Sequence, residues 1–142
     1  MTLLLVATLS VSFSSCKNDD EPVILDDYII GSWHSFKGVV TASGKSETID
    51  ISKTGDYSLA YIEVDFLNGG QAICRGWDMD SNGLVTWVEE RCTYSTNNDI
   101  VTMTSPEGET VSLVFDNNKT LCYKTITTIY GSAVMMSVYL KK

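Results

Sequence analysis

The chain has 142 residues, 44% of them hydrophobic and 20% charged, and its formal net charge is −8 with a pI near 4.4. This length allows one domain with short segments outside it, and the composition excludes a low-complexity or fibrous chain. The acidic balance argues against nucleic acid as a partner, because Lys and Arg are needed to displace the counterions of the phosphates. One histidine and four cysteines leave little material for a transition-metal site. The abundance of Ser and Thr favours strands over helices.

The segment before Cys16 is predicted to be a signal peptide, residues 1–15. It contains a short apolar run, residues 3–11. A helix that crosses a bilayer takes about 20 apolar residues, so this run suits the apolar core of a signal peptide instead. Ser14 and Ser15 before Cys16 resemble a lipobox, where a signal peptidase cleaves before an acylated cysteine. Phe13, in place of an aliphatic residue, and the lack of a basic residue near the start depart from the usual pattern.

A polar, acidic segment follows Cys16. The run Lys17-Asn18-Asp19-Asp20-Glu21 resembles the signal that exports Bacteroidota-type lipoproteins to the outer face of the outer membrane. Residues 16–27 are therefore interpreted as a lipidated cysteine and an acidic tether, since several acyl chains on one cysteine anchor a protein durably. The prediction is an outer membrane lipoprotein exposed at the cell surface. The alternative is a secretory protein with a chance cysteine and a solvated linker.

The first part of the body is predicted to be a helical turn followed by short strands. One turn is expected near residues 24–30, closing an end of the fold. Residues 38–56 fit either two strands or a strand and a long loop. Ile62, Val64 and Phe66 then alternate with polar neighbours, the period of a half-buried strand. Asn68-Gly69-Gly70 follows and indicates a hairpin turn.

The C-terminal half continues the same alternation. Residues 84–94 are expected to form the longest strand, and turns are expected at Asp80–Gly83, Ser95–Asn98 and Ser105–Gly108. The remaining strands are expected at residues 71–78, 99–104, 109–115, 120–129 and 133–142. Inward-facing apolar positions are Val111, Leu113, Phe115, Val134, Met136, Val138 and Leu140.

Successive hairpins about 10 residues apart predict an up-and-down meander. A long meander leaves two unpaired edges that invite aggregation, and closing the sheet on itself removes both. The predicted fold class is therefore all-β, an up-and-down antiparallel barrel of about eight to nine strands with no long helix, over residues 28–142. A β-sandwich or another open meander is the alternative.

A resemblance to a known family supports the barrel. Ile30-Gly31-Ser32-Trp33 resembles the Gly-x-Trp signature that opens the first strand of lipocalins and bacterial lipocalin-like domains. Residues 92–95, 99–104 and 139–142 are similar to that group's recurring strand pattern. The resemblance covers residues 28–142 and is better to the bacterial branch, which lacks the C-terminal helix. It implies that Gly31 permits a tight turn into the strand and that Trp33 plugs the base of the barrel.

The sequence from Asp78 to Glu89 satisfies the calcium-loop pattern D-x-[DN]-x-[DN]-G-x5-E, with Asp78, Asp80, Asn82 and Glu89 as the alternative metal ligands. That loop needs a helix on each side, whereas β-formers run through this one. With a hairpin turn at Asn82-Gly83, Glu89 lies six residues up a strand, about 20 Å away. We therefore predict a plain turn, and neither a metal site nor a cofactor.

Nucleophilic catalysis is not supported, and the protein is not expected to be an enzyme. The only imidazole is His34, and nothing local pairs it with Cys74, Cys92 or Cys122. With the turn near Asn82, Cys74 comes opposite about residue 90, so Cys92 is diagonal to it, which is not ideal for a disulfide. The sequence is compatible with one disulfide between two of these cysteines and with three free thiols.

The expected function, implied by the resemblance, is a non-catalytic binding module for a small apolar or amphipathic ligand inside the barrel. A surface interaction or structural protein with a barrel filled by side chains is the alternative. An empty cavity of several hundred Å³ favours the first of these. A monomer is favoured. The expected ligand-lining residues are Trp33, Val64, Phe66, Leu113, Phe115, Tyr123 and Met136.

Overall fold

The computed structural model describes residues 25–129 and 131–142, so the signal segment, Cys16 and most of the acidic tether lie outside the described residues. This part of the chain contains a short helix, α1 (Leu25–Tyr28), a 3-10 turn, η1 (Ser58–Ala60), and nine strands. None of its helices has the length and apolar character needed to cross a bilayer. The strands are β1 (Gly31–Ala42), β2 (Lys45–Asp50), β3 (Ile62–Leu67), β4 (Gln71–Met79), β5 (Val85–Asn97), β6 (Ile100–Thr104), β7 (Thr110–Phe115), β8 (Leu121–Ile129) and β9 (Ser132–Lys141).

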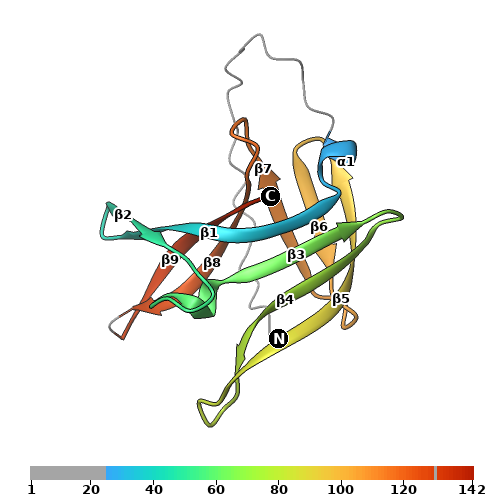
Figure 1. Cartoon of the computed structure of the whole chain (residues 1–142). Helices are drawn as coiled ribbons and strands as arrows, with labels where there is room; N and C mark the ends of the chain where they lie inside the picture. The colour runs from blue at the N-terminus through green and yellow to red at the C-terminus, as the bar shows by residue number, and fades with distance from the viewer. Residues whose placement is uncertain (1–24, 130) are drawn as a thin grey trace.

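The strands form a closed antiparallel barrel (Figure 1). From β3 to β9 each strand pairs with the next in the chain, and β1 pairs with both β3 and β9, which closes a ring of eight strands. The ninth strand, β2, pairs with the second half of β1 and lies outside the ring. The predicted lipocalin-like up-and-down barrel without a long helix is confirmed, and the open alternatives are wrong. Closure gives every strand of the ring two partners.

A bulge in β1 divides the strand into two halves. Its pairing with β9 shifts between Ser35 and Lys37, so Phe36 is an extra residue and the alternation changes phase there. One edge of β1 consequently pairs first with β3 and then with β2. A methyl group on Gly38 would lie 3.0 Å from Ile49 and 3.1 Å from Ile51, so the missing side chain makes room for both isoleucines. Residues 38–56 thus hold the rest of β1, then β2, then a loop.

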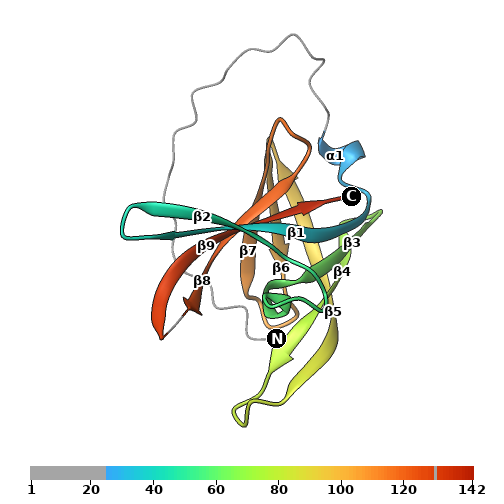
Figure 2. The ribbon, with the colours of Figure 1, turned by 60° about the vertical axis from the view of Figure 1, so that its left-hand side comes forward.

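The barrel is tightly paired near α1 and splayed at the other end. The pairing of β7 with β8 consists of Val114 with Cys122 and Phe115 with Leu121. Beyond these two pairs the strands diverge, as Figures 1 and 2 both show. In contrast, β8 and β9 pair from Leu121 to Ile129 without interruption. The wall therefore has a seam between β7 and β8 that opens away from α1.

The core is the inner face of the ring. The expected inward positions on β3, β7 and β9 are on this face, because register places each opposite another inward residue. Since alternate side chains of a strand point to opposite faces, the polar neighbours of these residues point to solvent. Every strand of the ring contributes at least one buried side chain: Trp33, Val64, Phe66, Ala72, Cys74, Cys92, Val101, Met103, Leu113, Leu121, Met136, Val138 and Leu140.

Candidate functional site

One end of the barrel is closed by Trp33 and α1. Gly31 has a φ of 125°, a backbone conformation that favours glycine, and this turns the chain from α1 into β1. Trp33 then points inward and is 1% exposed. Its Nε1 donates a hydrogen bond to the carbonyl oxygen of Ile29 at 2.7 Å, and its ring meets the ring of Tyr28 edge-on at 5.8 Å. The expected helical turn and Trp33 together seal this end.

A buried hydroxyl lies next to Trp33 on the inner face of β1. The Oγ of Ser35 accepts a hydrogen bond from the backbone N–H of Ile62 at 2.9 Å and lies 3.4 Å from the carbonyl oxygens of Ala60 and Ile62. Buried polar groups are almost always paired in this way. The contact attaches β1, just before its bulge, to the start of β3.

All seven residues predicted to line a ligand site lie on the inner face of the barrel. Five of them, Trp33, Val64, Phe66, Leu113 and Met136, are buried in one apolar cluster. Side chains this completely covered leave little surface for a ligand. The remaining two are partly buried and pack against that cluster: Phe115 and Tyr123.

The accessible part of the inner face begins where β7 and β8 separate. Val111 on β7, Tyr123 on β8 and Val40 on the second half of β1 are partly buried and pack on the core. Met136 of β9 lies opposite Val40 and links this region to the buried cluster. These side chains give the inner face an apolar lining near the splayed end. Small-molecule sites are lined mainly by apolar side chains with few polar groups.

A carboxylate in the middle of β5 faces this interior. Glu90 on β5 lies directly opposite Cys74, which in turn lies opposite Val64, so all three share the inner face. Burial raises the pKa of the Glu90 carboxyl, and the neighbouring carboxyl of Glu107, within hydrogen-bonding range, raises it further. Glu90 was not among the expected site residues. Its even spacing from Cys74 and Cys92 indicates that it shares their face of the sheet, so the sequence did contain a signal for it.

Glu90→Gln is expected to stabilise the fold at pH 7 by about 0.5–1 kcal/mol and to have no effect at pH 3.5. The folded pKa lies above the unfolded value of about 4.3. Protonated Glu90 therefore stabilises the fold fully at pH values below the unfolded pKa. This stabilisation is lost as the pH rises through the folded pKa. Urea unfolding at both pH values measures the difference. The adjacent Glu89→Gln is the control: Glu89 accepts a hydrogen bond from Arg75 at 2.8 Å on the outer face, so no stabilisation is expected. Equal effects of the two changes would contradict the interpretation.

The thiols are not arranged for catalysis. Cys74, Cys92 and Cys122 are free, and burial raises the pKa of each, which keeps it in the unreactive protonated form. Cys74 pairs with Glu90 while Cys92 pairs with Ala72, so the two inner thiols are diagonal as expected. His34 is on the opposite face of β1 from Trp33, so its ring points away from the inner thiols.

The four alternative metal ligands do not converge. The Oδ1 of Asp80 accepts hydrogen bonds from the backbone N–H groups of Asn82 at 2.8 Å and Leu84 at 2.9 Å, which closes the predicted turn. Asp78 pairs with Thr86 on the inner face, whereas Glu89 pairs with Arg75 on the outer face. Among the described residues no group of three His, Cys, Asp or Glu side chains is placed to hold a metal ion. The hairpin prediction is confirmed.

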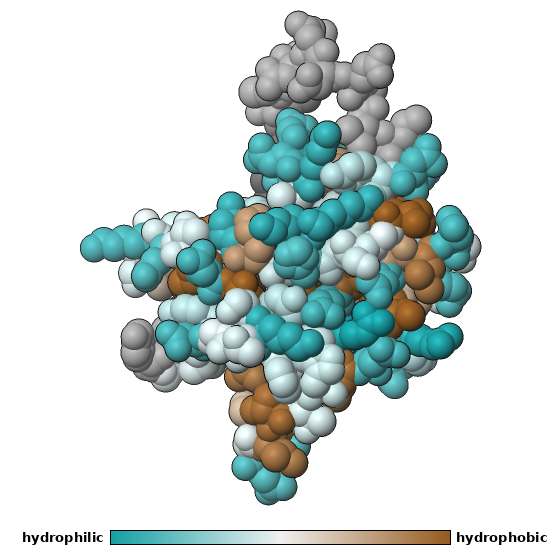
Figure 3. Space-filling model, in the orientation of Figure 1, coloured by the Kyte–Doolittle hydropathy of each residue, from teal (hydrophilic) through white to brown (hydrophobic). Residues whose placement is uncertain are grey.

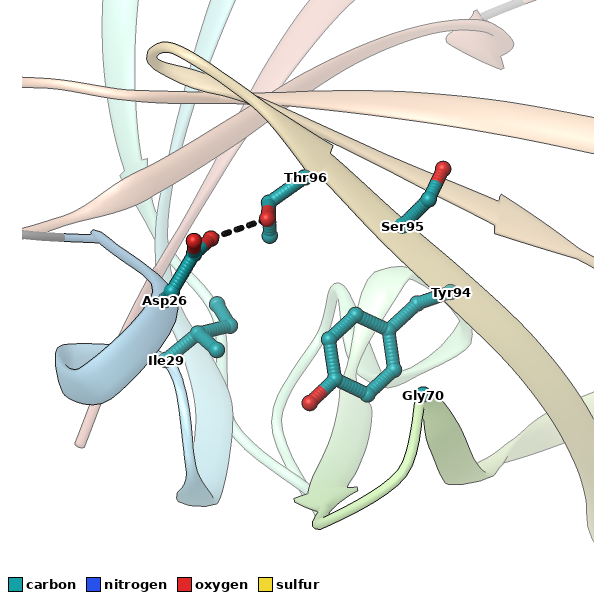
Figure 4. A pocket seen from close by; sticks show the side chains of 6 residues that line it. All are labelled: Asp26, Ile29, Gly70, Tyr94, Ser95 and Thr96. Carbon is teal, nitrogen blue, oxygen red and sulfur yellow. Dashed lines mark hydrogen bonds between the residues drawn. The ribbon is translucent and has the colours of Figure 1, made fainter.

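A hollow lies beside α1 (Figure 4). It has a volume of about 220 Å³ and is open to solvent. Its walls are mostly polar, and a hydrogen bond from Thr96 to Asp26 crosses it. Tyr94 forms one side, its hydroxyl donating to the carbonyl oxygen of Leu67 at 2.8 Å. Ligand pockets are usually about 300–1,000 Å³ and mainly apolar, so this hollow is smaller and more polar than a typical ligand site.

The eight-stranded up-and-down barrel places the chain in the lipocalin-like fold class, an assignment that comes from its own strand pairing. No protein-family model matches the chain, and no curated protein matches it. Solved structures similar to it are lipocalin-like. A lipocalin-like protein from Bacteroides uniformis is 17% identical, with a TM-score of 0.41, and the match covers 81% of this chain and 99% of that one. The siderocalin Ex-FABP is 14% identical (TM-score 0.41; 80% and 73% covered), and lobster apocrustacyanin A1 is 11% identical (TM-score 0.38; 82% and 61% covered).

Proposed function

We propose that the barrel is a non-catalytic binding module that takes one small apolar or amphipathic molecule at its splayed end. The observation that carries the proposal is the seam between β7 and β8, which leaves apolar inner-face residues such as Val111 and Tyr123 only partly buried. Burying such surface against a ligand is favourable by about 25 cal/mol per Å². The inward carboxyl of Glu90 adds a polar group that can orient an amphipathic ligand. The protonated thiols and the outward His34 provide no nucleophile and base.

A second function is supported by a different observation. Five of the seven expected lining residues are fully covered, which suits a barrel filled by its own side chains. About eight strands is the size at which side chains either just fill a barrel or leave room for one small ligand. The second candidate is therefore a surface interaction or structural protein without a ligand.

Probe binding decides between the two functions. An environment-sensitive fluorescent fatty acid is expected to bind saturably, at about one molecule per chain. Val111→Trp should abolish this binding, because Val111 lies on the inner face and the larger ring would occupy the site. Ser112→Trp is the matched control: the next residue along β7 is exposed on the outer face, so binding should be unchanged.

Two results would favour the filled barrel. One is the absence of saturable binding by the unmodified protein. The other is a Val111→Trp variant that binds no probe but is also destabilised by about 1–3 kcal/mol, as overpacked cores are. A cleft that accommodates a ligand should accept the indole with little loss of stability.

We further propose that the protein is an exported lipoprotein, anchored to the outer membrane by acylated Cys16 and exposed at the cell surface. The support is the sequence around Cys16 and the acidic residues after it. Cys16→Ala is expected to move the protein from the detergent phase to the aqueous phase of a detergent-partition assay. A matched Cys122→Ala variant should remain in the detergent phase. Retention of the Cys16→Ala variant in that phase would exclude lipid on this cysteine.

A further inference from the structure

An apolar surface patch surrounds the hairpin of β4 and β5. Of the nine large apolar side chains that are exposed in the described chain, five lie on this hairpin or in the segment before β3. Met79, Leu84 and Val85 are 55%, 66% and 42% exposed. In Figure 3 brown residues gather on the projecting hairpin. The other two are Tyr57, directly before η1, and Leu59, within η1, which packs against β4.

The patch is on the outer face of the barrel wall. Met79 pairs with Val85, and Trp77 pairs with Trp87, so these four side chains occupy the same outward face. Outward positions in a barrel of a soluble domain are normally polar, as Arg75 and Glu89 are further along the same strands. We call Trp77, Met79, Val85 and Trp87 the hairpin patch, and Leu84, opposite Asp80, lies on the other face of the same hairpin. Exposed apolar patches that are rimmed by polar residues mark interaction sites.

The aromatic rings of the hairpin patch are held in place and have little free surface. The rings of Trp77 and Trp87 meet edge-on at 5.1 Å, and the Tyr61 ring stacks on Trp87 at 6.2 Å. The Nζ of Lys53 lies 3.8 Å from the centre of the Trp87 ring, and its carbonyl oxygen accepts a hydrogen bond from Trp77 Nε1 at 3.0 Å. A sugar needs an open ring face to stack on, so a carbohydrate is disfavoured. The ordered rings instead form a rigid base under the exposed aliphatic side chains.

The charges around the hairpin patch indicate which kind of partner can bind to it. It is bordered by the bases Lys53, Arg75 and Arg91 and by four carboxylates, which leaves a net charge of −1: Glu63, Asp65, Asp80 and Glu89. A second copy of this chain, with a net charge of −8, would be repelled, and so would an anionic membrane. The tip of the hairpin, Asp80–Gly83, is also polar, which opposes insertion into lipid.

We propose that the hairpin patch docks a protein partner whose contact surface is apolar and bordered by Lys and Arg. The projecting hairpin supplies a convex apolar ridge on a rigid aromatic base, and the buried centre of a protein interface is depleted in charged residues. The surrounding carboxylates would orient a basic partner and accelerate its association. This surface is separate from the barrel interior and does not depend on a ligand there.

The experiment uses a synthetic amphipathic peptide of leucine and lysine, titrated into the full chain by fluorescence anisotropy. The double variant Met79→Ser with Val85→Ser, which removes the paired exposed side chains of the patch, is expected to bind it at least tenfold more weakly. The control is Ile126→Ser with Met135→Ser, which removes two paired side chains of similar exposure, 42% and 44%, from the outer face of β8 and β9. Its affinity should stay within twofold of the unmodified protein.

Charge is tested separately with Asp80→Asn, which keeps an oxygen for the hydrogen bonds of the turn. This change should weaken binding about twofold and reduce its salt dependence, and a peptide of leucine and glutamate should not bind. Equal losses in the hairpin and control variants, or equal binding of the two peptides, would overturn the proposal. A dimer in sedimentation analysis that is lost in the hairpin variant would also overturn it, because the occupant would then be a second copy of the chain. Binding to anionic phosphatidylglycerol vesicles that is lost in the same variant would do so as well, because the occupant would then be a membrane.

Discussion

Trp33→Ala is expected to lower the free energy of unfolding by about 3–5 kcal/mol, as truncations of large buried aromatic residues do. The side chain is 1% exposed and is the largest of the fully buried residues. Its removal would leave a cavity at the closed end of the barrel and would leave the carbonyl oxygen of Ile29 without its donor. The Tyr28 ring would lose its edge-on contact as well. Urea unfolding followed by circular dichroism measures the change.

The control for this prediction is the same truncation on the outer wall. Trp77→Ala removes a half-buried ring, one hydrogen bond to Lys53 and one aromatic contact, and it should cost only about 1–2 kcal/mol. A loss below about 1 kcal/mol for Trp33→Ala would mean that this indole is not part of the core. It would also remove the main support for α1 and Trp33 as the seal of the barrel.

Ser35→Ala is expected to lower the free energy of unfolding by about 1–3 kcal/mol, although it removes a single oxygen atom. The Ser35 side chain is fully buried, and its Oγ is the acceptor for the N–H of Ile62 at 2.9 Å. Alanine would leave that donor unpaired in the barrel interior, where water cannot replace the lost partner. The same measurement of urea unfolding applies.

Ser137→Ala is the matched control for Ser35→Ala. Ser137 lies on the outer face of β9, between the inward residues Met136 and Val138, so its loss should change the stability by less than about 0.5 kcal/mol. A negligible effect at both serines would indicate that the hydroxyl of Ser35 is not needed to attach β1 to β3. Hydrogen exchange of the Ile62 amide, expected to accelerate in the Ser35→Ala variant, reports on the same contact directly.

Local patterns were sufficient for the strands and most turns. Side chains of a strand alternate between two faces, so the spacing of Ile62, Val64 and Phe66 identified the inner face without knowledge of any partner. The turn at Asp80–Gly83 was predictable because its geometry depends on residues within the turn itself. Register then followed by counting from that turn, which correctly placed Cys74 opposite residue 90.

The candidate site was only partly predictable. All seven expected residues lie on the inner face of the barrel, as their alternation predicted. How deeply each is buried depends on strands distant in the sequence. Val111 and Tyr123 are only partly buried where β7 and β8 diverge after two residue pairs, and nothing in either strand marks that seam. The environment of Glu90 likewise depends on Glu107, which a separate hairpin brings close to it.

By itself the sequence therefore determined the all-β meander: the alternation of apolar residues and the turns between strands predict it, and the need to remove exposed edges favours its closure. Only the tertiary structure decided where that barrel opens and what its outer wall presents. The bulge at Phe36 directs one edge of β1 to two different strands, and the pairing of Trp77 with Trp87 gathers an apolar patch on the solvent side. Both outcomes arise because contacts between distant residues set the curvature and register of the sheet, whereas local periodicity sets only which side of a strand each residue faces.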